Sequence, residues 1–274
     1  MNRLRTVWAD LAAAKRTGLV VYITQGDPSP ESTADICQAV AEAGADVIEL
    51  GVPFSDPNAD GVVIQAAMQR ALARGGGLDG ALSAVADLRR RGCQVPVVLF
   101  GYYNPIFVRG VDRFAGQAAA AGADAVLTVD LPIGELDELR EPLARAGLDV
   151  VPLVAPTTGP DRLRALGGLD APFVYYISMT GITGAEFRGA AGGAERIRAV
   201  RQASGSPVAV GFGIKTPDDA RAVATFADGV VVGSAVIQRI ADAPDPGAAA
   251  RSAAAFVADL RAALDGSGGP RDTA

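Results

Sequence analysis

The chain has 274 residues, of which 49% are hydrophobic, and a formal net charge of -6. A chain of this length can bury one large core, and single α/β barrels fall in the same size range. The acidic balance argues against binding to nucleic acid or to an anionic membrane surface, because both need clustered lysine and arginine. Small molecules or proteins remain as partners.

Histidine is absent from the sequence. General acid–base catalysis near neutral pH would therefore fall to carboxylates or tyrosines. The two cysteines, Cys37 and Cys93, show neither metal-ligand spacing nor a disulfide framework, so we interpret them as small buried apolar residues of a protein in a reducing cytoplasm. No uninterrupted apolar run reaches about 18 residues, and we expect a soluble protein that is not exported.

Eight short runs rich in Val, Ile and Leu alternate with Ala-rich segments of helical spacing. The predicted strands are residues 19–24, 46–50, 95–99, 124–129, 148–153, 172–177, 207–211 and 228–232. The predicted helices are residues 2–16, 31–43, 79–91, 111–121, 135–146, 159–167, 194–204, 216–226 and 235–264.

Apolar strands that alternate with helices predict a parallel sheet with a covered outer face, and eight such units close into a (β/α)8 TIM barrel. We expect one barrel domain over residues 1–265, with extra N-terminal and C-terminal helices, and a disordered tail at 266–274. A doubly wound open sheet is the alternative. Weak internal repeats of one βα unit, each with a helix end, a tight turn and a strand start, occur at residues 41–46, 119–124, 143–149 and 224–229.

The stretch ELGVPFSDPNADG, residues 49–61, places a glutamate inside an apolar strand and an aspartate in the following loop. A buried charge is costly unless it is paired or used. Glu49 ends the second predicted strand, where barrels carry their functional groups, so the pattern favours catalysis by Glu49 and Asp60. A core ion pair and a turn residue are the alternatives.

Two other kinds of chemistry fit the sequence less well. Residues 56–61 match the first half of an EF-hand loop, but its twelfth position, which needs a glutamate, is Ala67, so we predict no metal site. A Schiff-base aldolase needs a buried lysine at a strand end. The only lysines are Lys15 and Lys215, and Lys215 follows a glycine pair at a predicted helix start.

Glycine-rich segments follow the last three predicted strands, at residues 178–184, 211–217 and 233–235. Glycines let backbone N–H groups approach an anion, and a helix N-terminus adds partial positive charge. Loops after strands seven and eight are the usual phosphate site of this fold. Three such segments in register favour phosphate binding over simple turns.

Several motifs resemble, in order and spacing, the tryptophan synthase α-subunit family from about residue 3 to 262: ELGVPFSDPNADG, GYYNPIF, VDLP, YYISMTGITGAE, VGFGIKTPDDARAV and ADGVVVGSA. The resemblance implies retro-aldol cleavage of indole-3-glycerol phosphate to indole and glyceraldehyde 3-phosphate. It also implies an αββα heterotetramer, in which the β subunit carries pyridoxal phosphate and receives the indole, whereas this chain needs no cofactor.

The resemblance assigns roles to individual residues. Glu49 would be the acid and base, Asp60 would accept a hydrogen bond from the indole N–H, and Tyr175 would support the acid, although packing alone would also explain Tyr175. The implied substrate-binding residues are Tyr22 and Phe212 at the indole ring, Gly184, Gly213, Gly233 and Ser234 at the phosphate, and Thr183 and Gly211. The implied β-subunit contacts are Asp56, Pro57, Asn104 and Pro132, of which Asn104 and Pro132 also fit ordinary loop chemistry.

Three residues depart from the family pattern: Asn58, Val62 and Met179. They put loop closure and communication with a β subunit in question, but neither acid is lost. The alternatives are a stand-alone lyase that releases free indole, a non-catalytic phosphate-binding regulator, and a sugar-phosphate isomerase or epimerase. We also expect the segment 178–193 to be a mobile lid that ligand protects from protease.

Overall fold

The structure is a computed structural model, and it describes residues 2–177, 193–211 and 213–266. The described strands are all parallel and form one sheet in the order β5-β4-β3-β2-β1-β9-β8-β7-β6. Their bounds are β1 Gly18–Thr24, β2 Val47–Gly51, β3 Val97–Gly101, β4 Ala125–Thr128, β5 Asp149–Val150, β6 Leu153–Val154, β7 Val174–Ile177, β8 Val208–Gly211 and β9 Gly229–Val232.

The barrel closes through the fifth predicted strand, which the structure divides into β5 and β6. The Val151 N–H still donates to Val126 O on the β4 side (2.9 Å), whereas the Pro152 carbonyl accepts from the Tyr175 N–H on the β7 side (3.0 Å). Proline has no N–H to donate, so the ladder changes partner there. The single strand expected at 148–153 was wrong in this detail, but the closed (β/α)8 barrel is confirmed and the open sheet is excluded.

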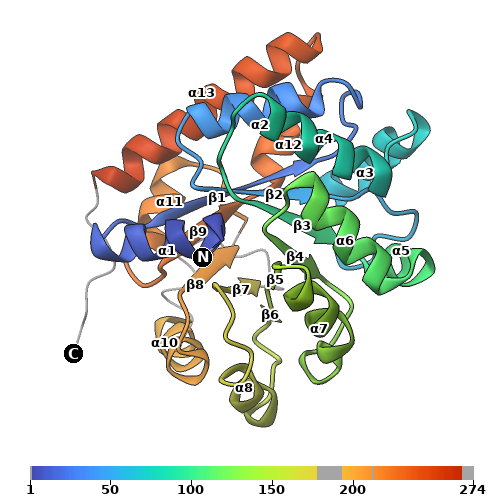
Figure 1. Cartoon of the computed structure of the whole chain (residues 1–274). Helices are drawn as coiled ribbons and strands as arrows, with labels where there is room; N and C mark the ends of the chain where they lie inside the picture. The colour runs from blue at the N-terminus through green and yellow to red at the C-terminus, as the bar shows by residue number, and fades with distance from the viewer. Residues whose placement is uncertain (1, 178–192, 212, 267–274) are drawn as a thin grey trace.

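Helices surround the strands (Figure 1). Their bounds are α1 Arg3–Ala13, α2 Thr33–Glu42, α3 Val62–Ala73, α4 Leu78–Arg90, α5 Tyr103–Arg109, α6 Val111–Ala121, α7 Asp137–Arg145, α8 Pro160–Leu166, α10 Gly193–Ser204, α11 Pro217–Ala224, α12 Ser234–Ala241 and α13 Pro246–Asp265, with a 3-10 turn η1 at Ile133–Glu135. The prediction missed α3 and α5, which follow β2 and β3.

The long C-terminal helix expected at 235–264 was also wrong, because the chain forms α12 and α13 there. Asp245 starts the second helix: its side chain accepts from the Ala248 N–H (2.7 Å), and Pro246 occupies the first helical position. Helix α13 packs against α2, α11 and α12. None of the helices in the described part of the chain has the length and hydrophobicity needed to span a bilayer.

The extra N-terminal helix α1 covers one end of the barrel. Trp8 is buried and lies against Phe173, with ring centroids 5.1 Å apart. A Cβ at Gly18 would lie 3.1 Å from the Trp8 ring and one at Gly229 would lie 2.6 Å from it, so both strand starts have glycine where the indole ring packs. Because α1 closes the amino ends of the strands, the open end of the barrel is at their carboxyl ends.

Both cysteines are free. Cys37 is buried in α2, as expected, and burial raises the pKa of its thiol to about 12. Cys93 is only half-buried, so the expectation of a buried residue was correct for Cys37 alone. Of the tail expected at 266–274, all but Gly266 lies outside the described residues.

Candidate active site

A pocket of about 580 Å³ opens at the carboxyl ends of the strands. Its size falls within the usual range for small-molecule sites. Eight of the residues expected at the site line it: Tyr22, Glu49, Asp60, Tyr175, Gly211, Gly213, Gly233 and Ser234. The other three, Phe212, Thr183 and Gly184, lie outside the described residues, as do Met179 and nearly all of the expected lid at 178–193.

Glu49 lies on β2 beside Tyr22 of β1 and Val98 of β3. Its side chain is fully buried, and no described residue gives either carboxyl oxygen a hydrogen bond or an ion pair. Burial raises its pKa from 4.5 to about 8. A core ion pair within the described part of the chain is therefore excluded, and the raised pKa favours the protonated carboxyl at neutral pH.

Asp60 lies in the loop between β2 and α3 and is half-buried. Burial raises the pKa of its carboxyl, and a hydrogen bond from Tyr102 opposes the rise. The Tyr102 hydroxyl donates to Asp60 Oδ2 (2.7 Å) and accepts from the Ala59 N–H (3.0 Å). Two carboxyl groups thus face one pocket in different surroundings: among the described residues, Glu49 has no hydrogen-bond donor and Asp60 has one.

Aromatic side chains surround these acids. Phe100, at the end of β3, lies edge-on to Tyr22 (centroids 5.3 Å apart, interplanar angle 82°) and 6.3 Å from the Tyr175 ring. Burial raises the pKa of both tyrosines, with further rises from Asp60 at Tyr22 and from Glu49 at Tyr175, so both hydroxyls stay protonated. The sequence analysis missed Phe100, whose only signal was its place at a predicted strand end.

Two glycines make room for the tyrosine hydroxyls. A Cβ at Gly211 would lie 2.6 Å from Tyr175 Oη, and one at Gly51 would overlap the Tyr22 ring and hydroxyl. Gly211 was expected as a substrate contact, and it lines the pocket, but it also leaves the space that Tyr175 fills. Gly51 was not predicted, because nothing in the local sequence shows which side chain approaches it.

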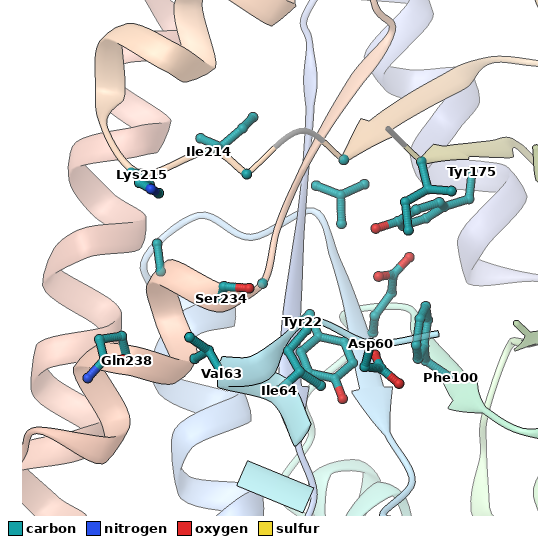
Figure 2. A pocket seen from close by; sticks show the side chains of 18 of the residues that line it. Tyr22, Asp60, Val63, Ile64, Phe100, Tyr175, Ile214, Lys215, Ser234 and Gln238 are labelled. Atoms are coloured by element: carbon teal, nitrogen blue, oxygen red, sulfur yellow. The ribbon is translucent and has the colours of Figure 1, made fainter. Parts of the chain in front are cut away.

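Another side of the pocket has the groups for an anion. Figure 2 shows Ser234, Lys215 and Gln238 apart from Asp60 and Phe100. Helix α12 begins at Ser234, and the first N–H groups of a helix have no carbonyl partner within it. Gly213 adopts φ +42°, a left-handed conformation that favours glycine. Lys215 and Arg239, which the sequence analysis did not assign to the site, also line the pocket.

The four expected partner contacts lie outside the pocket lining. Asp56, Asn104 and Pro132 are exposed, whereas Pro57 is buried. Large apolar side chains nearby in sequence are also exposed: Val62 by 79%, Phe107 by 59% and Val108 by 77%.

The described residues contain no group of three His, Cys, Asp or Glu side chains that could hold a metal ion. The structure of α3 does not fit an EF-hand loop either. Ala67, at the position of the required glutamate, is a buried residue of that helix.

The closed barrel and the pocket at the carboxyl ends of its strands define a (β/α)8-barrel enzyme. A family model described as "Tryptophan synthase alpha chain" matches residues 8–264. The tryptophan synthase alpha chain of Xylella fastidiosa (strain M12) is 48% identical over 265 residues, which are 97% of this chain and 99% of that relative. The chain therefore belongs to the tryptophan synthase alpha chain family.

Solved structures agree with this assignment. Tryptophan synthase subunit alpha from Legionella pneumophila str. Paris has a TM-score of 0.89 and 40% identity, covering 97% of this chain and 99% of that one. A chain of tryptophan synthase from M. tuberculosis, in an open form with BRD0059 bound, has a TM-score of 0.85 and 32% identity, covering 96% of this chain and 98% of that one. The chain is thus a carbon–carbon lyase of tryptophan biosynthesis that cleaves indole-3-glycerol phosphate to indole and glyceraldehyde 3-phosphate.

Proposed function

We propose that Glu49 is both the acid and the base of this cleavage. Its protonated carboxyl gives a proton to indole C3. The resulting carboxylate then removes the proton of the adjacent glycerol hydroxyl while the C–C bond breaks, so indole and the aldehyde leave and the carboxyl is protonated again. The observation that carries this assignment is the buried Glu49 carboxyl, which has no partner in the described part of the chain and whose pKa is raised to about 8, so that the acid form is available at neutral pH.

Asp60 has the complementary role. Protonation of C3 places positive charge on the indole ring, and a carboxylate that accepts from the indole N–H stabilises that charge. This role needs an ionised carboxyl, and the hydrogen bond from Tyr102 favours the ionised form of Asp60. Burial acts alone on the pKa of Glu49, which it raises to about 8, whereas the hydrogen bond from Tyr102 opposes burial at Asp60; this contrast supports the division of work between them.

Substrate binding uses the two sides of the pocket. Tyr22 and Phe100 hold the flat indole ring, the resemblance adds Phe212 to them, and Tyr175 supports the acid Glu49. The backbone N–H groups of Gly213, Gly233 and Ser234 bind the phosphate, where the resemblance adds Thr183 and Gly184. The glycines, the start of α12 and the nearby Lys215 support this end as the anion site.

We further propose that a β subunit binds this chain in an αββα heterotetramer and takes up the indole on its own pyridoxal phosphate. The exposed residues Asp56, Asn104 and Pro132 contribute to the contact surface, whereas Pro57, also expected there, is buried in the isolated chain. The exposed apolar side chains Val62, Phe107 and Val108 support a protein-binding surface, because most of their area faces solvent in the isolated chain. Residues 1–265 are one cytoplasmic catalytic domain without a cofactor of its own.

The test is indole release from indole-3-glycerol phosphate by the purified chain, with and without a β subunit. We expect slow release that the partner accelerates. Glu49→Gln and Asp60→Asn should each lower the rate on the order of 10²-fold or more. Glu31→Gln, which changes an exposed glutamate, is the matched control.

Each alternative has its own outcome in this assay. Fast release that ignores the partner would identify a stand-alone lyase. No release, with glycerol phosphate still bound, would identify a non-catalytic phosphate-binding barrel or a sugar-phosphate isomerase. Full activity of Glu49→Gln would remove Glu49 from the mechanism while leaving the family's reaction in place.

A further inference from the structure

Tyr102 lies outside the pocket lining but forms a hydrogen bond with Asp60, which lines the pocket. It directly follows β3 and is the N-cap of α5. Its hydroxyl donates to Asp60 Oδ2 at 2.7 Å and accepts from the Ala59 N–H at 3.0 Å. Its ring stacks on Phe54, with centroids 4.8 Å apart and an interplanar angle of 25°. One side chain thus contacts the loop between β2 and α3 at both ends.

The hydrogen bond to Asp60 is of a strong type, because a carboxylate acceptor shortens and strengthens it. Tyr102 is 6% exposed, so little water competes for this bond. The bond restricts the rotation of the Asp60 carboxylate, whose residue lies near the end of the loop between β2 and α3. Among the described residues, Tyr102 is the only side chain with a hydrogen bond to the Asp60 carboxyl.

Tyr102 also connects Asp60 to the exposed helix α5. The next residue, Tyr103, has its N–H bound to Asp130 Oδ1 (2.8 Å), two residues before Pro132. Its ring contacts Phe107, with centroids 5.9 Å apart, and Phe107 is 59% exposed. A partner that covers Phe107 would therefore press on the segment that begins with Tyr102.

We propose that Tyr102 is a positioning residue that transmits partner binding on α5 to the orientation of the Asp60 carboxylate. This inference rests on the proposed function, in which α5 faces the β subunit and Asp60 stabilises the charged indole. The partner accelerates cleavage, in this account, because it fixes α5 and thereby fixes Tyr102 and the carboxylate bound to it.

Tyr102→Phe tests the idea, since it removes the hydroxyl and keeps the ring that stacks on Phe54. We expect kcat of the complex to fall about tenfold or more, with KM changed by less than about threefold. The activation factor, which is the ratio of kcat with the β subunit to kcat without it, should fall in parallel. Tyr176→Phe is the matched control. It also removes a buried tyrosine hydroxyl that forms a hydrogen bond with a charged side chain, that of Arg196. Consecutive strand residues point to opposite faces of the sheet, so the Tyr176 hydroxyl points away from the pocket that Tyr175 lines.

A double-mutant cycle with Asp60→Asn separates positioning from general destabilisation. Tyr102→Phe should cost less than about threefold in the Asp60→Asn background if it acts through the carboxylate. Equal cost in both backgrounds, unchanged kcat, or a full activation factor in Tyr102→Phe would each overturn the proposal. If the wild-type chain releases no indole, the proposed function fails and this inference fails with it, whereas an active wild type with a normal Tyr102→Phe variant refutes this inference alone.

Discussion

At the scale of single residues, the site depends on carboxyl groups whose surroundings set their proton affinity. Glu49 has no hydrogen-bond donor from the described residues, and Asp60 has the Tyr102 hydroxyl. Burial therefore acts unopposed at Glu49 and opposed at Asp60. The difference in hydrogen bonding explains why burial changes the proton affinity of the two acids to different extents.

Glu49 should reduce stability as pH rises. Below about pH 4.5 the carboxyl is protonated in both the folded and the unfolded chain. Between that pH and about 8 only the unfolded chain ionises it, so the free energy of unfolding falls, by up to about 5 kcal/mol, and the contribution levels off above the folded pKa. Urea unfolding of wild type and Glu49→Gln at pH 5 to 9 measures this, and parallel curves would contradict the raised pKa.

Position 211 requires a glycine because the Tyr175 side chain fills the space that a Cβ would occupy. In Gly211→Ala the new Cβ would meet the Tyr175 hydroxyl at 2.6 Å, so the ring must move and kcat should fall about tenfold or more. In a Tyr175→Phe background the same change should cost much less, because the hydroxyl is gone. Gly116→Ala, where a Cβ would meet nothing within 4 Å, is the control and should leave kcat unchanged.

Lys215 should contribute to phosphate affinity through its charge. In Lys215→Met we expect KM for indole-3-glycerol phosphate to rise about fivefold, with kcat within twofold, because an exposed ion pair contributes about 1 kcal/mol. The effect should shrink at high salt. Lys15→Met removes the only other lysine, which is exposed in the turn after α1, and should change neither constant. A normal KM in Lys215→Met would show that backbone groups suffice.

At the scale of elements, an aspartate at the start of a strand repeatedly ties that strand to its neighbour. Asp46, Asp124 and Asp228 each lie one residue before a strand: β2, β4 and β9. Each side chain accepts a backbone N–H at the start of the neighbouring strand: Leu19 of β1 (2.7 Å), Val97 of β3 (2.9 Å) and Val208 of β8 (2.8 Å). An arginine pairs with each aspartate: Arg261, Arg89 and Arg201. The internal repeats found in the sequence contain these aspartates, so the repeats mark a structural unit.

Asp124 should be the most costly of these to remove. It is 2% exposed and is bound by Arg3, Arg89 and the Val97 N–H. Asp124→Ala should lower the free energy of unfolding by about 3–5 kcal/mol, because it leaves buried donors without an acceptor. Asp112→Ala, which breaks an exposed pair with Arg145, should cost below about 1 kcal/mol. Denaturant unfolding compares the two, and similar costs would contradict this account.

At the scale of the whole molecule, the barrel separates stability from chemistry. Helix α1 and the aspartate–arginine pairs lie at the amino ends of the strands, and the pocket lies at the carboxyl ends. The segments that follow β2 and β3 carry both the acid Asp60, in a loop, and the exposed apolar side chains, in α3 and α5. Contact with a partner and contact with substrate can therefore affect each other over a short path.

Phe107 should matter for the partner and not for the isolated chain. We expect Phe107→Ser to weaken β-subunit binding about tenfold or more, because an aromatic side chain is lost from the contact surface. Indole release without partner should stay unchanged. Leu72→Ser, which alters an exposed apolar residue of α3, is the control. Titration of the activation by the β subunit measures both variants, and unchanged affinity for Phe107→Ser would place the contact elsewhere.

Local sequence patterns determined the class of fold and much of the site. Strand runs, helix spacing and glycine positions depend on nearby residues, which is why the barrel, most helices and the acids at a strand end were predicted. Of the helices that were missed, α3 follows a loop whose conformation depends on contacts from elsewhere in the chain, such as the hydrogen bond of Ala59 to Tyr102, and α5 begins directly after β3.

The tertiary structure alone decided which distant residues meet. Tyr102 and Gly51 carry no local signal, and Phe100 only its place at a predicted strand end, because their roles depend on side chains from other strands or loops. The pKa of Glu49 likewise follows from complete burial without a donor from the described residues, a property of the assembled barrel and not of the strand that carries it. Sequence therefore determined which chemical groups are present and on which element each lies, whereas packing decided which of them act together.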